Sequence, residues 1–69
     1  MIEVFKTDVQ QTGTADLLVA KLVSLFPGSR VNFDLEDCDR VLRVEGENIC
    51  TEKTKHLLRT CGYNCEVLV

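Results

Sequence analysis

The side chains best suited to chemistry in this 69-residue chain are four cysteines, at Cys38, Cys50, Cys61 and Cys65. Their separations of 12, 11 and 4 residues contain no Cys-x-x-Cys pair of the kind that binds zinc. The N-terminus shows no basic region followed by an apolar one, so we predict no signal peptide and expect reduced thiols rather than disulfides. We expect Cys61 and Cys65 to be buried and Cys38 to be an exposed turn residue.

Other polar groups form no recognisable catalytic set. Four carboxylates lie within six residues, at Asp34, Glu36, Asp37 and Asp39. They lack the glycine-turned loop of a calcium site, so we expect a solvated hairpin tip. His56 is the only histidine, and no partner is evident that would make it a general base. The serines and threonines have no assigned base either, so we predict no enzyme and no cofactor.

Composition limits the classes of partner. Acidic residues outnumber basic ones, the net charge is −3, and the Lys and Arg residues are scattered, which argues against nucleic-acid binding. No apolar run approaches the roughly 18 residues of a membrane span. We therefore expect a cytoplasmic protein with one domain over residues 1–69, and its 45% hydrophobic content is ordinary for a folded domain.

Periodicity predicts six elements. Alternation indicates strands over 2–7, 30–35, 40–45 and 63–68, and helical spacing indicates helices over 14–26 and 49–61. The order βαββαβ predicts an α+β, ferredoxin-like sandwich, with a four-stranded antiparallel sheet in the order 4-1-3-2. Both helices should cover one face of that sheet.

The first helix should be capped by Thr12 or Thr14, with Asp16 in its first turn. Its inward arc is expected to hold five apolar residues, Ala15, Val19, Leu22, Val23 and Phe26, flanked by Leu18 and Leu25. Leu17 lies nearly opposite this arc and should face solvent. An exposed leucine beside the first loop would be explained by a contact surface, although single exposed apolar residues are also common.

In the second half, the alternation places Leu42 and Val44 inward and Val41 outward. Asn48 is the expected cap of the second helix. The buried stripe of that helix should include Cys50, Thr54, Leu57, Leu58 and Cys61. Gly62 should end the helix, because a glycine readily adopts the left-handed conformation of a helix C-terminus.

With these elements in place, the sequence resembles the heavy-metal-associated domain of copper chaperones and metal-pumping ATPases. The resemblance rests on order and spacing, through Phe26-Pro27-Gly28, the Val31/Phe33 and Leu42/Val44 strands, and Cys61-Gly62-Tyr63. The family carries Met-x-Cys-x-x-Cys in the first loop. Counting back from Pro27 places its two cysteines at Thr12 and Ala15, so both thiolate ligands that would select Cu(I) are missing.

The resemblance therefore implies a small non-catalytic domain that has lost its metal site. We predict a protein-interaction module that binds a protein partner or itself, with no bound metal ion. Its expected surface comprises Gln11, Thr12, Gly13, Thr14, Leu17, Gly62 and Tyr63. The acidic hairpin and the basic residues of the second helix, Lys53, Lys55 and Arg59, would tune docking.

Two alternatives stay open. The first is a Cu(I) or Zn²⁺ carrier that uses cysteines outside the motif, because the predicted topology places Cys38 and Cys61 at one end of the sheet and Cys50 at the other. The second is a small enzyme of the acylphosphatase type. That chemistry needs an arginine in a phosphate-binding loop, and the first loop holds no basic residue.

Overall fold

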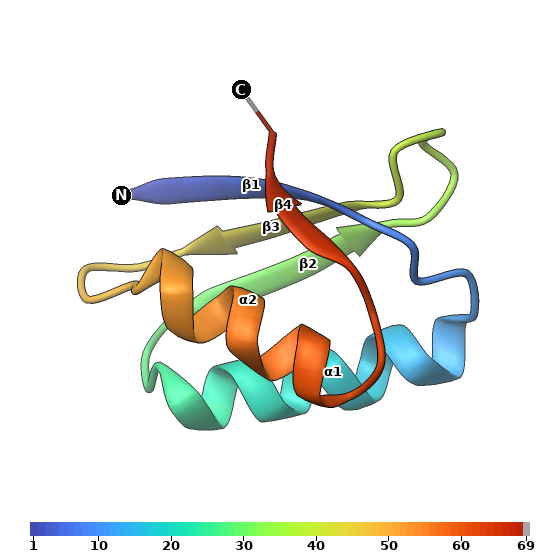
Figure 1. Ribbon diagram of the computed structural model, residues 1–69. Coiled ribbons are helices and arrows are strands. Elements are labelled where there is room, and N and C mark those ends of the chain that lie inside the picture. Colours follow the sequence, from blue (N-terminus) through green and yellow to red (C-terminus); the bar gives the residue numbers. More distant parts are fainter. Residues whose placement is uncertain (69) are drawn as a thin grey trace.

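The computed structural model describes residues 1–68, and its six elements follow the predicted order. They are β1 (Ile2–Thr7), α1 (Thr12–Leu25), β2 (Arg30–Asp34), β3 (Val41–Glu45), α2 (Thr51–Thr60) and β4 (Cys65–Val67) (Figure 1). Val69, the last residue of the predicted domain 1–69, lies outside the described residues. Among the described residues, no helix is both long enough and apolar enough to cross a membrane.

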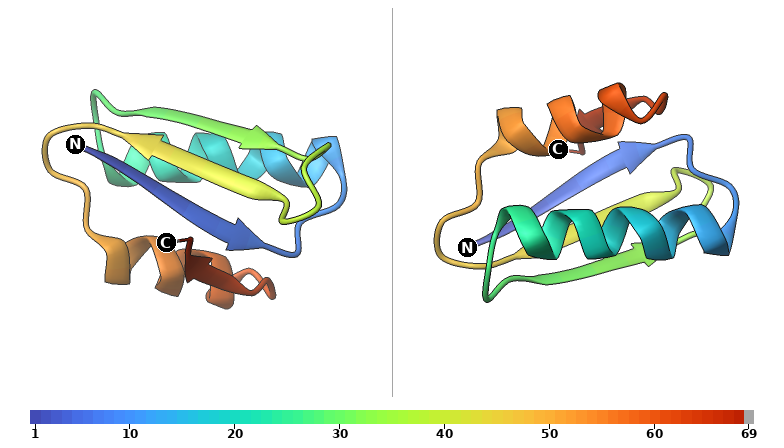
Figure 2. Two further views of the ribbon diagram at one scale, coloured as in Figure 1. Left: turned by 90° about the horizontal axis from the view of Figure 1, so that it is seen from above. Right: turned by 90° about the horizontal axis from the view of Figure 1, so that it is seen from below.

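The four strands form one antiparallel sheet in the order β2-β3-β1-β4, which is the predicted order 4-1-3-2 counted from the other edge. Leu42 of β3 stands at the centre, paired with Phe5 of β1 on one side and Phe33 of β2 on the other. Both helices lie on one face of the sheet (Figures 1 and 2). The predicted α+β, ferredoxin-like fold is confirmed.

The core fills the space between the sheet and the helices. Phe5, Leu42, Leu22 and Leu58 have no exposed surface, and Leu18 is 1% exposed. Full burial of an apolar side chain of this size stabilises a fold by about 1.5–3 kcal/mol. The strand alternation and the helix periodicity thus place their large apolar residues in one shared layer.

The first helix begins two residues earlier than predicted. Its N-cap is Gln11, whose backbone is extended and whose side chain makes no capping bond, so the predicted capping by Thr12 or Thr14 is wrong. Asp16 consequently falls outside the first turn. The reason lies in the preceding loop, because Val9 is fully buried and only two residues separate this anchor from the helix.

The buried face of α1 is also rotated relative to the prediction. Leu18, expected at the flank, is 1% exposed, whereas Val23, expected inside, is 39% exposed. The cause is that α1 contacts α2 as well as β2, which turns its apolar arc toward the second helix. Leu17 is 57% exposed, as predicted.

Two further predictions, one about burial and one about helix capping, are wrong. Val41 was expected to face solvent but is 7% exposed, because it lies in register between Lys6 and Asp34 on the neighbouring strands. Asn48 does not cap α2: the N-cap is Cys50, which makes no side-chain capping bond. The oxygen of Cys50 instead accepts bonds from the backbone N–H and the hydroxyl of Thr54, at 3.1 and 3.0 Å.

The C-terminal end of α2 behaves partly as expected. Gly62 has φ +95°, the left-handed conformation that ends a helix, so its predicted role is confirmed. The last strand is shorter than predicted and begins at Cys65, which leaves Tyr63 in the preceding turn. Cys65 is fully buried, and Tyr63 is half-buried against the core.

Candidate functional site

Three connections that are distant in sequence gather at one end of the molecule: the first loop (residues 8–11), the hairpin loop (residues 35–40) and the turn after α2 (residues 61–64). They lie together beyond the ends of β1 and β2, whereas the segment that leads into α2 lies at the other end (Figures 1 and 2). Hydrogen bonds join the first loop and the adjoining end of β1 to both other connections.

The first loop is held to the hairpin loop through Thr7. Its hydroxyl donates to the backbone oxygen of Arg40 at 2.6 Å and accepts from the N–H of Val9 at 3.3 Å. The N–H of Thr7 donates to the oxygen of Asp39 at 3.1 Å. Since the Val9 side chain is fully buried, the loop is fixed by apolar burial on one side and by hydrogen bonds on the other.

Asp8 joins the first loop to the turn after α2. One oxygen of its carboxylate accepts from the backbone N–H of Asn64 at 2.9 Å, and the other accepts from the side-chain amide of Asn64 at 3.0 Å. We did not predict this clamp from the sequence, because the two residues are 56 positions apart. It sets the Gly62-Tyr63 turn beside the loop that precedes α1.

The hairpin loop is closed by Arg40, which has φ +47°, an uncommon conformation for a residue with a side chain. Its guanidinium donates to the backbone oxygen of Leu35, and its N–H donates to the oxygen of Asp37 at 3.0 Å. The N–H of Asp39 donates to the Asp37 carboxylate at 2.9 Å. The predicted acidic tip is therefore an ordered turn, with Glu36 and Asp37 exposed.

The predicted interaction residues are nearly all accessible. Five are exposed and two, Thr14 and Tyr63, are half-buried; the exposed ones are Gln11, Thr12, Gly13, Leu17 and Gly62. The two positions at which the family would carry cysteines differ sharply. Thr12 is the exposed first residue of α1, and Ala15 is 4% exposed in the core.

Two of the four cysteines are exposed and two are sheltered, and all four are free thiols. Cys38 is exposed and Cys65 is buried, as predicted, but Cys61 is exposed, because it follows the last turn of α2 and points away from the core. Burial, with a smaller contribution from the Glu66 carboxylate, raises the pKa of the Cys65 thiol to about 11. Cys50 is half-buried.

Only one possible ligand cluster is found within residues 1–68. It consists of Asp37, Cys38 and Asp39, whose ligand atoms lie within 4.8 Å of one another, and Cys61 does not belong to it. Lys6 shares this region, with its Nζ 3.9 Å from a carboxylate oxygen of Asp39. Carboxylate and thiolate ligands of this kind suit zinc.

Two of the basic residues of α2 form ion pairs with the same carboxylate. Arg59 donates to Glu66 of β4 at 2.8 Å, and the Lys55 ammonium lies 3.6 Å from the other oxygen of the same carboxylate. The Arg59 hydrogen bond, together with the Lys55 charge, lowers the pKa of Glu66 from its usual range. His56 is exposed, as predicted, with Nε2 3.5 Å from the hydroxyl of Thr60.

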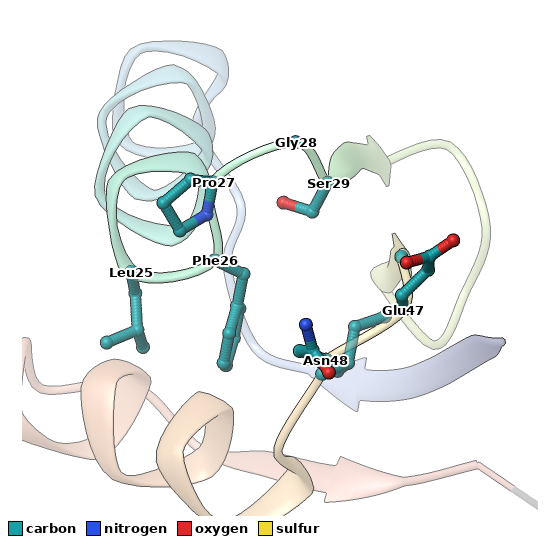
Figure 3. A pocket seen from close by; sticks show the side chains of 9 residues that line it. Leu25, Phe26, Pro27, Gly28, Ser29, Glu47 and Asn48 are labelled. Carbon is teal, nitrogen blue, oxygen red and sulfur yellow. The ribbon is translucent and has the colours of Figure 1, made fainter.

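A pocket that the sequence did not indicate lies at the other end of the molecule, with a volume of about 340 Å³. It is lined by the Leu25–Ser29 turn after α1 and by residues 46–49 before α2 (Figure 3). The buried hydroxyl oxygen of Ser29 has no hydrogen-bond partner among the described residues. The lining combines apolar side chains with the Ser29 hydroxyl, the Glu47 carboxylate and the Asn48 amide.

Comparison with known proteins leaves the family open. No family model matches the chain, and neither a curated protein nor a solved structure matches it. The fold and the surface described above therefore carry the functional argument.

Proposed function

We propose that this domain is a small, non-catalytic protein-binding module of the heavy-metal-associated type that has lost the metal site of that family. It contacts a protein partner, or a second copy, through the first loop, the beginning of α1 and the Gly62-Tyr63 turn. A cytoplasmic location and the absence of a cofactor remain predictions from the sequence.

The observation that carries this proposal is Leu17, which is 57% exposed on α1 next to the anchored first loop. An apolar side chain on a rigid frame loses little conformational freedom when a partner covers it, which favours binding. The frame here is the buried Val9 together with the two hydrogen bonds that Asn64 donates to Asp8. A rigid surface with an apolar centre and a polar rim is the usual anatomy of a protein interface.

Charge supports a partner with basic groups. Near this surface the hairpin loop exposes Glu36 and Asp37, whereas on α2 the Lys55 and Arg59 charges are paired with Glu66. Of the three basic residues expected to tune docking, Lys53 is the one without an ion-pair partner among residues 1–68. The acidic hairpin is thus the stronger source of electrostatic steering.

The test is Leu17→Asp, compared with Ser24→Asp as a matched control. Ser24 lies two turns further along the same exposed face of α1, and both variants add one carboxylate to an exposed position. Leu17→Asp should weaken pull-down of a partner by tenfold or more, with unchanged circular dichroism, while Ser24→Asp retains it. Equal behaviour of the two variants would eliminate Leu17 as the contact.

A second candidate function is metal transfer, which the clustering of Cys38 with Asp37 and Asp39 favours. Titration of the reduced protein with Zn²⁺ and Cu(I) against a competing chelator tests it directly. One-to-one binding that is lost in Cys38→Ser and kept in Cys61→Ser would assign the ion to this cluster. Loss of binding in both variants would indicate that Cys38 and Cys61 bind the ion as a pair. Weak binding by every variant and by the unmodified protein would refute metal transfer.

A further inference from the structure

Within residues 1–68, the outer edge of the sheet at β2 is unpaired. In the strand order β2-β3-β1-β4, β2 bonds only to β3, and its other side faces outward (Figure 2). Such an edge presents free backbone N–H and C=O groups, which can pair with another strand. Neither a proline nor a lysine interrupts the five residues of β2. Proline and lysine, two common means of blocking an edge strand, are therefore missing from this one.

The sequence of β2 is complementary to itself when it is reversed. Its residues are Arg30, Val31, Asn32, Phe33 and Asp34, which read basic, apolar, amide, apolar and acidic. If two copies pair antiparallel about Asn32, each Arg30 faces an Asp34, and each Val31 faces a Phe33. Opposite charges and aromatic or β-branched pairs are the favourable cross-strand combinations in antiparallel sheets.

Both charged residues are available for this pairing. Arg30 and Asp34 are exposed, and within residues 1–68 neither takes part in an ion pair. Val31 and Phe33 alternate with them and point to the face that carries the helices, where Phe33 is only half-buried. A second strand at this edge would cover Phe33 and give each charge a partner.

A groove beside the edge extends the contact. It has a volume of about 470 Å³ and runs between α1 and β2, lined by Thr12, Ala15, Asp16, Val19, Val31, Asn32, Phe33 and Leu35. Val23 lies one turn after Val19 on α1 and is 39% exposed. Because a two-fold axis perpendicular to the sheet keeps the helices of both copies on one face, the second copy would bring its own α1 toward Val19 and Val23.

We propose that β2 is a homodimer interface, at which two copies pair antiparallel about Asn32 and form a continuous eight-stranded sheet. The interface is isologous, as a two-fold axis requires, because each residue meets its reversed counterpart. A five-residue strand alone buries less than the roughly 1,200 Å² of a standard interface, so the helices contribute and the dimer is reversible. This surface differs from the one around Leu17, and the inference does not depend on the proposed function.

The register follows from the same residues. A shift by one residue would place the apolar side chains of one copy on the face of the polar side chains of the other. A shift by two would pair the end of β2 with residues of the adjoining turns, outside the strand. Pairing about Asn32 is thus the register that uses all five residues of the strand.

The experiment is a charge exchange followed by sedimentation velocity over a concentration series. Arg30→Asp places two carboxylates opposite each other at both symmetric positions, and Asp34→Arg does the same with guanidinium groups. Each single variant should weaken the dimer by about tenfold or more, because two attractive pairs become repulsive. An equimolar mixture of the two variants should form a heterodimer, and the double variant R30D/D34R should recover the homodimer.

Arg43→Asp is the matched control, because Arg43 is an exposed arginine on the interior strand β3, in register with Asn32. It should dimerise like the unmodified protein. Circular dichroism checks that each variant is folded, and recovery in the mixture or in the double variant excludes misfolding as the cause. A monomeric unmodified protein at millimolar concentration, or single variants that dimerise normally, would overturn the inference. Leu17→Asp should leave this dimer intact, which separates it from the proposed binding surface.

Discussion

Replacing Asp8 by alanine tests how the candidate binding surface is held together. The Asp8 carboxylate accepts two hydrogen bonds from Asn64, one from the backbone N–H at 2.9 Å and one from the side-chain amide at 3.0 Å. Asp8→Ala removes both bonds. Asn64→Ala removes only the second, because its backbone N–H remains. The structure therefore predicts that the two substitutions lower the free energy of unfolding by different amounts, although both residues belong to the same contact.

The magnitudes follow from the number of bonds. A hydrogen bond contributes about 0.5–1.5 kcal/mol net, and both bonds here lie at the surface, where water competes. We expect Asn64→Ala to cost about 0.5–1 kcal/mol and Asp8→Ala about 1–2 kcal/mol. In a domain of this size, 1 kcal/mol corresponds to a decrease in Tm of roughly 4–8 °C. The double variant should lose little more than Asp8→Ala alone, because the Asn64 side chain makes no other hydrogen bond within the described residues 1–68.

Urea unfolding of the two single variants and the double variant measures these values as a double-mutant cycle. Asp16→Ala serves as a control, because Asp16 is an exposed carboxylate without a hydrogen bond or ion pair in the described part of the chain. The reasoning is refuted if Asn64→Ala costs as much as Asp8→Ala, or if the two losses simply add. A loss in Asp16→Ala equal to that in Asp8→Ala would show a general charge effect instead.

Two further predictions concern ionisable groups. Iodoacetamide should modify Cys38 and Cys61 rapidly in the folded protein and spare Cys65, which is fully buried with a pKa raised to about 11; peptide mass mapping with equal modification of Cys65 would contradict this. Because Arg59 and Lys55 lower the folded pKa of Glu66, its stabilising effect is present above the unfolded value of about 4.3 and is lost as the pH falls through the folded pKa. The urea midpoint of Glu66→Gln should therefore be lower than that of the unmodified protein at neutral pH and equal to it in acid. A midpoint that is still lower in acid would refute the role of this carboxylate.

Most of the fold could be predicted from the sequence, because it depends on local alternation. The strand that enters the hairpin follows from apolar residues at every second position, which are Val31, Phe33 and Leu35. The helix boundaries could not be predicted as well. The start of α1 depends on the burial of Val9, and the rotation of its buried face toward Leu18 depends on α2, which lies far away in sequence. Local patterns contain neither of these tertiary contacts.

For the candidate site, the exposure of individual side chains was easier to predict than the hydrogen bonds that join distant segments. The exposed Leu17 follows from helical periodicity, since it lies opposite the apolar arc. Periodicity does not predict the clamp between Asp8 and Asn64 or the left-handed backbone conformation of Arg40. Each of them depends on a backbone path that only the folded chain defines. The exposure of Cys61 was missed for a similar reason, as the position falls just past the helix whose periodicity was used to predict it.

The early start of α1 limits what cysteines introduced at Thr12 and Ala15 could do. Cysteines at both positions would place one thiol on the first exposed residue of a helix and the other in the core, where Ala15 is 4% exposed. Burial raises the pKa of a thiol, as it does at Cys65, whereas a soft metal ion needs the thiolate. Two such substitutions would therefore yield one reactive and one inert sulfur, and a metal site built from both would also require the first turn of the helix to unwind.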